Sequence, residues 1–564
     1  MKKWLAVFWI LSVSLTLFGW GRGHEDHVGL VLKYLPAECS RIWSAKTKQE
    51  LQQHWSHSPD SHQKIVEGGA FPITPEAVRF LTESRIRTCY AFHSGAGKGG
   101  AFFLLVRSLR EKREEASAFF AGVLLHGIAD ANAFNHAPLI HHLTYTRYRH
   151  IHYPRADLDL SMMRENRVLA GKIAERLAGF SPDPGKGNLR ESVLALMLEE
   201  IDSNAYMCAR ENLLARTGPD GRASDAALDA MADIAAYQTR IGVNALCAAR
   251  RLADSGDPLD LTPADFMLKS PAALSGNKRR EPLLAEYERR KTAMLERRDP
   301  RTDAIYAGLF DQKDPAPAIG LVCEATYAMN HTFLGFGSKF LTGSIGRTLR
   351  KNGKNMEMLP LYDLKKRVPS PRRTPVLLLC LNGSAPGFAV RALRDYVSQG
   401  GKVLVIGGTS DLNLTGLAPF FERKKNEELP VSSVYGKANE KVIGSMRVCP
   451  AGPLKKVFKR REFAFRDNPN TSAGWNKPFS NLAIRTGDAS VVPLFELANG
   501  TERFCIAALK RDGTGRNVGA WLPQYLLMPF LFSDDTAMPD WSMPELDSFG
   551  SRLILAVLDE LLSR

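Results

Sequence analysis

The sequence predicts a multidomain protein: an all-α N-terminal domain followed by an α/β C-terminal domain built on a parallel sheet. The chain has 564 residues, which is too long for one hydrophobic core. Up to about residue 300, apolar residues recur at the i, i+3 and i+4 spacing of helices. Beyond about residue 315, short apolar runs alternate with helical segments, as in parallel α/β sheets.

The helical pattern divides into segments at clusters of Pro and Gly. We expect helices over residues 164–180, 189–216 and 224–255, and a solvated charged helix within 277–303 that leads to a linker. The predicted organisation is a signal peptide (1–19), a helical domain (20–275), a charged helix and linker (276–314) and an α/β domain (315–564).

The C-terminal domain should contain four buried strands, three helices and a hairpin. The run from Val376 to Leu381 is continuously apolar, which is typical of a strand covered on both faces. Asn352-Gly353 is a helix C-cap signal, and Asn499-Gly500 is a hairpin signal. The strands are expected at 318–323, 356–361, 376–381 and 402–408, the helices at 337–351, 388–398 and 549–562, and the hairpin at 496–510.

The N-terminus predicts export to the periplasm, the cell surface or the medium. Met1-Lys2-Lys3 is a basic start, and residues 4–18 form an apolar stretch shorter than the ~20 residues of a membrane span. Cleavage after Gly19 would make Trp20 the first residue. An uncleaved anchor is the alternative, because Leu17 is a poor residue at the −3 position.

Charge and cysteine content restrict the partners and the kind of stabilisation. The net charge of +15 favours anionic partners such as phosphodiesters, polyanions or an anionic lipid surface. The eight cysteines are scattered and show no C-x-x-C spacing, so we expect neither a disulfide framework nor a cysteine zinc site. A Cys39–Cys89 bridge is possible.

Histidines are concentrated in one part of the chain. Of the 13 histidines, 12 lie between His24 and His152, whereas core histidines would be spread more evenly. A metal centre is the common cause of such a concentration. A solvated histidine-rich loop is the alternative for His141, His142 and the group His54, His57 and His62.

The segment from His126 to His136 is the strongest metal signal. His126 and Asp130 are four residues apart and share one face of a helix that is otherwise apolar. A buried carboxylate needs a cation or strong hydrogen-bond donors. His136 follows the expected turn at 135–138. The pair is therefore a zinc half-site, or else a buried pair that satisfies itself.

This spacing resembles that of the zinc-dependent phospholipases C and the single-strand-specific nucleases. Their motif is a His, an Asp four residues later and a second His six residues after that Asp, which matches His126, Asp130 and His136. Their mature chains begin with a Trp whose amine and carbonyl bind zinc, as in Trp20-Gly-Arg-Gly-His24. The resemblance covers roughly residues 20–255 and implies an all-helical domain with two or three zinc ions.

The same resemblance assigns the metal ligands. Asp60, at the end of Trp55-Ser-His-Ser-Pro-Asp60, and His93, at the end of Cys89-Tyr-Ala-Phe-His93, would join His126 and Asp130 around one zinc. A second zinc would be held by Trp20 and His24, with Asp130 bridging. His27 competes with His24 for this role.

A third zinc would take His136 and His150. The resembling enzymes place a carboxylate four residues after the second of these histidines, but position 154 is Pro in this sequence. Asp157, Asp159 or Glu200 would have to substitute from elsewhere.

The resemblance implies an exported zinc-dependent phosphodiester hydrolase acting on phospholipid or nucleic acid, with Asp60 orienting or deprotonating the attacking water. Phe92, Phe134, Tyr145 and Tyr148 are candidate aromatics for stacking on a base. The alternative is a non-enzymatic exported binding or scaffold protein with a metal-stabilised helical domain. The missing carboxylate at position 154 favours that alternative.

The C-terminal half resembles the glutamine-amidotransferase-like, flavodoxin-type fold. The resemblance rests on residues 344–353 and 393–408 and on the closing helix. No Cys follows the strand that ends at Gly407-Gly408-Thr409, and no His follows His331, so Cys380 and Cys505 lack a usual general base. We therefore expect a non-catalytic binding, docking or oligomerising module.

Overall fold

A computed structural model of the chain divides into two compact units; the described residues up to Leu295 belong to the first and those from Glu296 onward to the second. The described residues are 22–60, 92–133, 166–208, 210, 213, 223–266, 282–296, 306, 308–311, 316–323, 336–381, 387–407, 447–459, 462–464, 484, 486, 489–523, 526–527 and 548–562. No helix within these ranges is both long enough and apolar enough to cross a bilayer.

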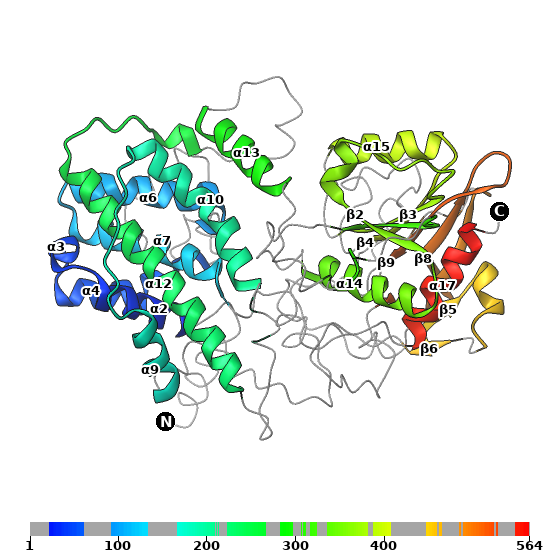
Figure 1. Ribbon diagram of the computed structural model, residues 1–564, viewed down its shortest axis with the longest axis horizontal. Helices are drawn as coiled ribbons and strands as arrows, with labels where there is room; N and C mark the ends of the chain where they lie inside the picture. Colours follow the sequence, from blue (N-terminus) through cyan, green and yellow to red (C-terminus); the bar gives the residue numbers. More distant parts are fainter. Residues whose placement is uncertain are drawn as a thin grey trace. The chain divides into compact units, whose positions relative to one another are not determined.

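The described part of the first unit is helical, as the sequence predicts (Figure 1). Its elements are α2 (Arg22–Tyr34), α3 (Ala37–Ser40), α4 (Ala45–Gln53), η1 (Trp55–Asp60), α6 (Gly95–Arg110), α7 (Glu114–Asp130), α9 (Arg167–Arg176), α10 (Leu189–Cys208), α12 (Asp225–Asp254), η6 (Pro263–Phe266) and α13 (Pro282–Leu295).

Almost every residue of helix α7 is buried, which shows that this helix lies at the centre of the unit. It packs against α6, η1, α4, α2 and α12. A helix that is apolar on all sides must be covered on all sides. Phe119, Phe120 and Leu124 have no exposed surface and belong to one continuous core. Whatever α7 carries is therefore held in a rigid and largely dry environment.

The charged segment before residue 300 is less solvated than the sequence suggests. Helix α13 buries Leu283 and Tyr287 in the core of the first unit, and its charged residues lie on its other faces. Glu286 forms ion pairs with Arg289 and Arg290 one turn away. The helix is thus amphipathic and is part of the helical unit rather than a free connector.

The described strands of the second unit form one nine-stranded sheet in the order β2-β1-β3-β4-β9-β8-β7-β5-β6. Its elements are β1 (Ile319–Cys323), α14 (Phe336–Lys351), β2 (Met356–Pro360), η9 (Leu361–Lys365), β3 (Val376–Leu381), α15 (Gly387–Ser398), β4 (Lys402–Gly407), β5 (Arg447–Pro450), η10 (Gly452–Lys456), β6 (Phe463–Ala464), β7 (Val491–Asn499), β8 (Glu502–Arg511), β9 (Asn517–Pro523) and α17 (Ser548–Leu562).

The sheet is mixed, which corrects the expectation of a parallel sheet. Neighbouring strands from β2 to β9 pair in parallel, whereas β9-β8, β8-β7, β7-β5 and β5-β6 are antiparallel. Figure 1 shows α15 on one side of the parallel part and α14 and α17 on the other. Helices on both faces explain why β1 is buried along its whole length.

Two local signals in this unit have the predicted geometry. Helix α14 ends in a left-handed Gly353 (φ 65°), with Lys354 N donating to the carbonyl of Leu349 and Gly353 N donating to that of Arg350. The predicted hairpin is formed by β7 and β8, with Asn499 paired to Glu502 across the turn. Both signals depend on a glycine that adopts positive φ at little cost.

Candidate metal centre

Helix α7 supplies His126 and Asp130 on one face, one turn apart. Both are almost completely buried: His126 is 0% exposed and Asp130 is 4% exposed. Their neighbours Leu125, Ile128 and Ala129 have no exposed surface. A carboxylate in such surroundings is costly unless a positive charge accompanies it. The local sequence thus places an anion in the core and requires a cation beside it.

The short 3₁₀ turn η1 brings Asp60 to this face of α7. Close approach is possible because residue 122 is glycine: a Cβ there would lie 3.0 Å from the carbonyl carbon of Trp55 and 3.2 Å from the nitrogen of Ser56. His93 comes from the residues just before Ser94, whose side chain caps α6 by accepting from Gly97 N at 3.0 Å. His24 comes from α2, which packs against α7.

Four of these side chains converge with their donor atoms at nearly equal distances. His93 Nε2 lies 3.3 Å from Asp60 Oδ1 and 3.2 Å from Asp130 Oδ2. His126 Nε2 lies 3.3 Å from Asp130 Oδ2, 3.7 Å from Asp60 Oδ1 and 3.1 Å from His93 Nε2. Ligands at ~2.0–2.1 Å from a tetrahedral ion are separated by roughly 3.3–3.4 Å. Five of the six separations among these four atoms are therefore close to the edge length of a coordination tetrahedron.

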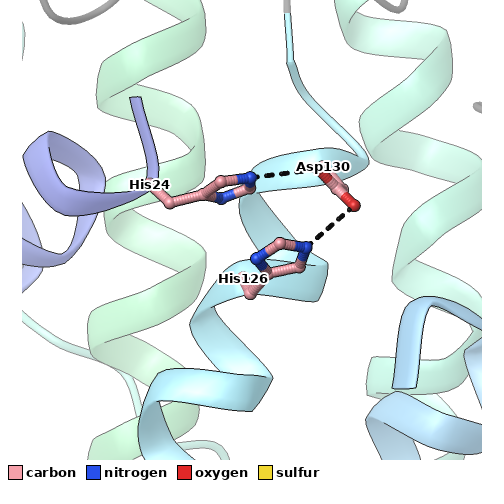
Figure 2. A group of neighbouring side chains, drawn as sticks. All are labelled: His24, His126 and Asp130. Carbon is pink, nitrogen blue, oxygen red and sulfur yellow. Dashed lines mark ion pairs between the residues drawn. The ribbon is translucent and has the colours of Figure 1, made fainter. Parts of the chain in front are cut away.

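A second group shares Asp130 with the first. His24 Nε2 lies 3.5 Å from Asp130 Oδ1, whereas His93 and His126 face Oδ2 of the same carboxylate. The rings of His24 and His126 stack with 3.8 Å between centroids and 16° between planes. Figure 2 shows both rings directed at the two oxygens of Asp130. The carboxylate is thus placed to bridge two cations.

The two residue groups meet the spatial requirement for holding a metal ion. His24, His126 and Asp130 form one set, and Asp60, His93 and His126 form another; within each set the ligand atoms lie within 4.8 Å of one another. Asp60 Oδ2 is buried and accepts no hydrogen bond from the described residues, although His24 Nε2 lies 4.0 Å away. The donor atoms are imidazole nitrogens and carboxylate oxygens, which bind divalent transition metals.

The backbone fixes which nitrogen of His126 faces the centre. His126 Nδ1 donates to the carbonyl of Ser56 at 2.6 Å, because a carbonyl can only accept. In a neutral ring this leaves the lone pair on Nε2, directed at His93 and Asp130. An imidazole oriented by such an outer hydrogen bond is the usual arrangement of a metal-binding histidine.

The charges of the cluster shift its pKa values in opposite directions. Burial lowers the pKa of His126, but the carboxylates of Asp130 and Asp60 outweigh burial and raise it to about 9. Burial and the neighbouring His126 charge lower the pKa of His24 well below its usual value. Burial raises the pKa of Asp130, yet His126, His93 and His24 hold it well below the ordinary range. A proton on His126 therefore supplies the positive charge when no metal does.

His24 and His27, the two candidates for the histidine ligand of the second zinc, lie in different surroundings. His24 lies against Asp130, whereas His27, one turn further along α2, belongs to neither ligand group of the described residues. His27 is fully buried, and burial lowers its pKa to about 3. A Cβ added to Gly242 of α12 would lie 3.6 Å from His27 Nε2. His27 thus faces α12.

His57 and Ser56 also lie at the site, although neither was among the ligands expected from the sequence. His57 Nε2 lies 3.3 Å from Glu25 Oε1, and its ring meets that of His24 edge-on at 6.0 Å. Its side chain is only 17% exposed, which corrects the interpretation as a solvated loop histidine; His54, at 50%, fits that description. His57 lies three residues before Asp60 in the same short turn η1, and this proximity to a predicted ligand is the sequence signal that could have identified it. The carbonyl of Ser56 has no sequence signal.

Of the remaining predicted ligands, only Glu200 lies within the described residues. Trp20, His136 and His150 lie outside the described residues, as do the alternative carboxylates Asp157 and Asp159. Glu200 is described, and its Oε2 lies 3.2 Å from the buried ammonium of Lys98. A carboxylate paired with a lysine is less available to a metal ion.

Of the two cysteines named in the α/β unit, Cys505 is buried and Cys380 is partly buried. Burial raises the pKa of Cys380 to about 12 and the pKa of Cys505 also to about 12. Both thiols are therefore protonated at neutral pH, and the thiolate is the nucleophilic form.

No protein-family model, curated protein or solved structure matches this chain. The geometry and chemistry of the residues themselves therefore carry the information on function.

Proposed function

We propose that the chain is an exported zinc-dependent phosphodiester hydrolase with an accessory α/β module. The observation that supports this most strongly is the convergence of Asp60, His93, His126 and Asp130, among which five pairs of donor atoms lie 3.1–3.7 Å apart. The ligand types and the near-tetrahedral spacing favour zinc over magnesium or calcium, which prefer oxygen ligands at higher coordination numbers.

The contacts of histidines with both carboxylate oxygens of Asp130 support a centre with more than one ion. His24 approaches Oδ1 and the other two histidines approach Oδ2, so neighbouring zinc ions would share this carboxylate. Bound zinc ions would neutralise phosphate oxygens and lower the pKa of a coordinated water. His126 is held by the Ser56 carbonyl, so its contribution is to fix the geometry of the centre.

Asp60 is the proposed catalytic carboxylate because it lies on the accessible side. The side chains of Asp60 and His93 are 17% and 14% exposed, whereas those of His24 and His126 are fully buried. A water molecule and a phosphodiester would therefore approach past Asp60. Its carboxylate would orient the attacking water and accept its proton.

Phosphodiesters are the proposed substrate class, either phospholipid or nucleic acid. The net charge of +15 favours approach of an anionic substrate. In this proposal the α/β unit binds or docks and does not carry out chemistry. A flavodoxin-type character fits its five parallel strands, which have helices on both faces.

The test combines metal analysis with turnover of the protein purified without residues 1–19. We expect at least two zinc ions per chain and hydrolysis of a phospholipid or a single-stranded nucleic acid, compared side by side. His126→Ala and Asp130→Asn should lower turnover by several orders of magnitude. Fewer than two zincs, or unchanged turnover in both variants, would overturn the site assignment.

The same experiment also tests the non-enzymatic alternative. A protein that binds zinc at this centre and is destabilised by zinc removal, yet hydrolyses neither substrate class, would be a binding or scaffold protein with a metal-stabilised helical domain.

A further inference from the structure

Two cysteines that are far apart in sequence meet in the core of the helical unit. Cys39 lies in the short helix α3 and Cys247 lies in the long helix α12, 208 positions later. Their Sγ atoms are 3.1 Å apart. The side chains are 8% and 6% exposed and belong to the same hydrophobic cluster. The sequence had suggested Cys89 as a partner for Cys39, but Cys89 lies outside the described residues.

The distance between the two sulfurs favours a covalent bond over a shared metal ion. Two thiolates on one zinc, at ~2.3 Å each, would be roughly 3.8 Å apart in tetrahedral geometry. The observed separation of 3.1 Å is shorter than that. Among the described residues, neither cysteine belongs to a group of three potential metal ligands. Only a small movement is needed to bring the sulfurs to the ~2.05 Å of a disulfide.

We propose that Cys39 and Cys247 form a disulfide that fastens α3 to α12. In this reaction the two thiols lose two protons and two electrons and the Sγ–Sγ bond forms. A small-molecule or protein disulfide accepts the electrons and protons through a mixed disulfide and leaves as two thiols. The proposal does not depend on zinc or on hydrolysis, and it would fail or succeed separately from the proposed function.

The location of the bond links it to the metal centre. Helix α3 directly follows α2, which carries His24, and α12 packs against α2. The contact is tight, because a Cβ on Gly242 would lie 2.8 Å from Val31 of α2. A bond from α3 to α12 would keep α2 between its neighbours. The closed loop would also contain Asp60, His93, His126 and Asp130, so local opening of the centre would be restricted.

Both thiols are protected from reagents in the folded protein. Burial raises the pKa of Cys39 and, more strongly, that of Cys247. Since the thiolate is the attacking species, exchange should be slow in the folded state and faster while the chain is folding. The oxidant must therefore be present during refolding.

Peptide mapping tests the bond directly. The full chain without residues 1–19 is refolded with reduced and oxidised glutathione, alkylated under denaturing conditions and digested with trypsin without reduction. Cleavage after Lys33, Arg41, Arg240 and Arg250 gives peptides 34–41 and 241–250, each with one cysteine. We expect one linked species, lighter by two hydrogen atoms than the sum of the peptides. Recovery of both peptides fully alkylated would overturn the proposal.

Thermal unfolding provides a second readout. Reduction of the oxidised protein with a phosphine, which avoids competition for zinc by dithiols, should lower its Tm by roughly 5–15 °C. The double variant Cys39→Ser/Cys247→Ser should not respond to reduction. The control Cys449→Ser, which alters a partly exposed cysteine of the α/β unit, should keep the full response. An equal response in the double variant would also contradict the proposal.

Discussion

His126 Nε2 lies 3.1 Å from His93 Nε2. Two imidazole nitrogens at this distance either share one proton or face one cation, because two protons between them would repel. The two carboxylates beside them supply negative charge at the same point. The relationship between these rings therefore defines the centre.

Asp130→Asn should remove more metal than His24→Ala. Asp130 faces both ligand groups, whereas His24 contributes to one of them. We expect Asp130→Asn to lose most of the bound zinc and His24→Ala to lose about one ion, as measured by elemental analysis after dialysis. His54→Ala, a half-exposed control on the neighbouring segment, should keep the full content. Equal losses in the two site variants would contradict a bridging role for Asp130.

Metal binding at pH 7 should release about one proton from His126. The carboxylates outweigh burial and raise the pKa of His126 to about 9, so the metal-free ring is protonated at pH 7. A metal ion requires the unprotonated nitrogen, and its affinity should therefore rise about tenfold per pH unit up to about pH 9. Calorimetric titration in buffers of different ionisation enthalpy measures the released proton. A binding heat that does not depend on the buffer would show that this prediction is wrong.

Gly122→Ala should damage the centre, whereas Gly171→Ala should stabilise the protein. A Cβ at position 122 would press against the backbone of Trp55 and Ser56 and displace η1, which carries Asp60. We expect a loss of about 1–3 kcal/mol in the free energy of unfolding and weaker zinc binding. Gly171 lies in α9 with open space around it, and the same change there should add ~0.5–1 kcal/mol.

Urea unfolding and zinc competition measure both glycine variants. Unchanged zinc affinity in Gly122→Ala would mean that α7 and η1 can separate without moving Asp60.

Glu199→Gln should remove a pH-dependent loss of stability. Burial raises the pKa of Glu199 to about 7, with Lys98 opposing the shift. Between pH 4.5 and about 7 the folded state keeps a proton that the unfolded state has lost, so stability falls as pH rises. At about 1.4 kcal/mol per pKa unit, the loss is roughly 3 kcal/mol.

Urea unfolding from pH 4 to pH 8 tests this dependence. The slope should flatten in Glu199→Gln and persist in Glu191→Gln, an exposed residue of the same helix. A slope that is identical in the wild type and Glu199→Gln would exclude Glu199 as its source.

Local sequence patterns predicted the positions of helices and strands better than they predicted how the strands pair. The expected strands 376–381 and 402–408 correspond to β3 and β4, and the helix within 224–255 corresponds to α12, capped by Ser224. The prediction of a parallel sheet failed beyond β9, because β8, β7, β5 and β6 extend the sheet with antiparallel pairs. Apolar alternation indicates that a segment is a strand, but the partner and direction of a strand depend on packing.

One half of the site follows from local sequence alone, because it depends only on helix geometry. His126 and Asp130 share a face because four residues make about one helical turn, whatever the rest of the chain does. The other relationships arise from tertiary packing: His24, rather than His27, faces Asp130, Ser56 orients His126, and Cys39 meets Cys247. Those relationships join separate segments, and they are fixed by how the helices pack around α7, where a single glycine determines how closely η1 can approach.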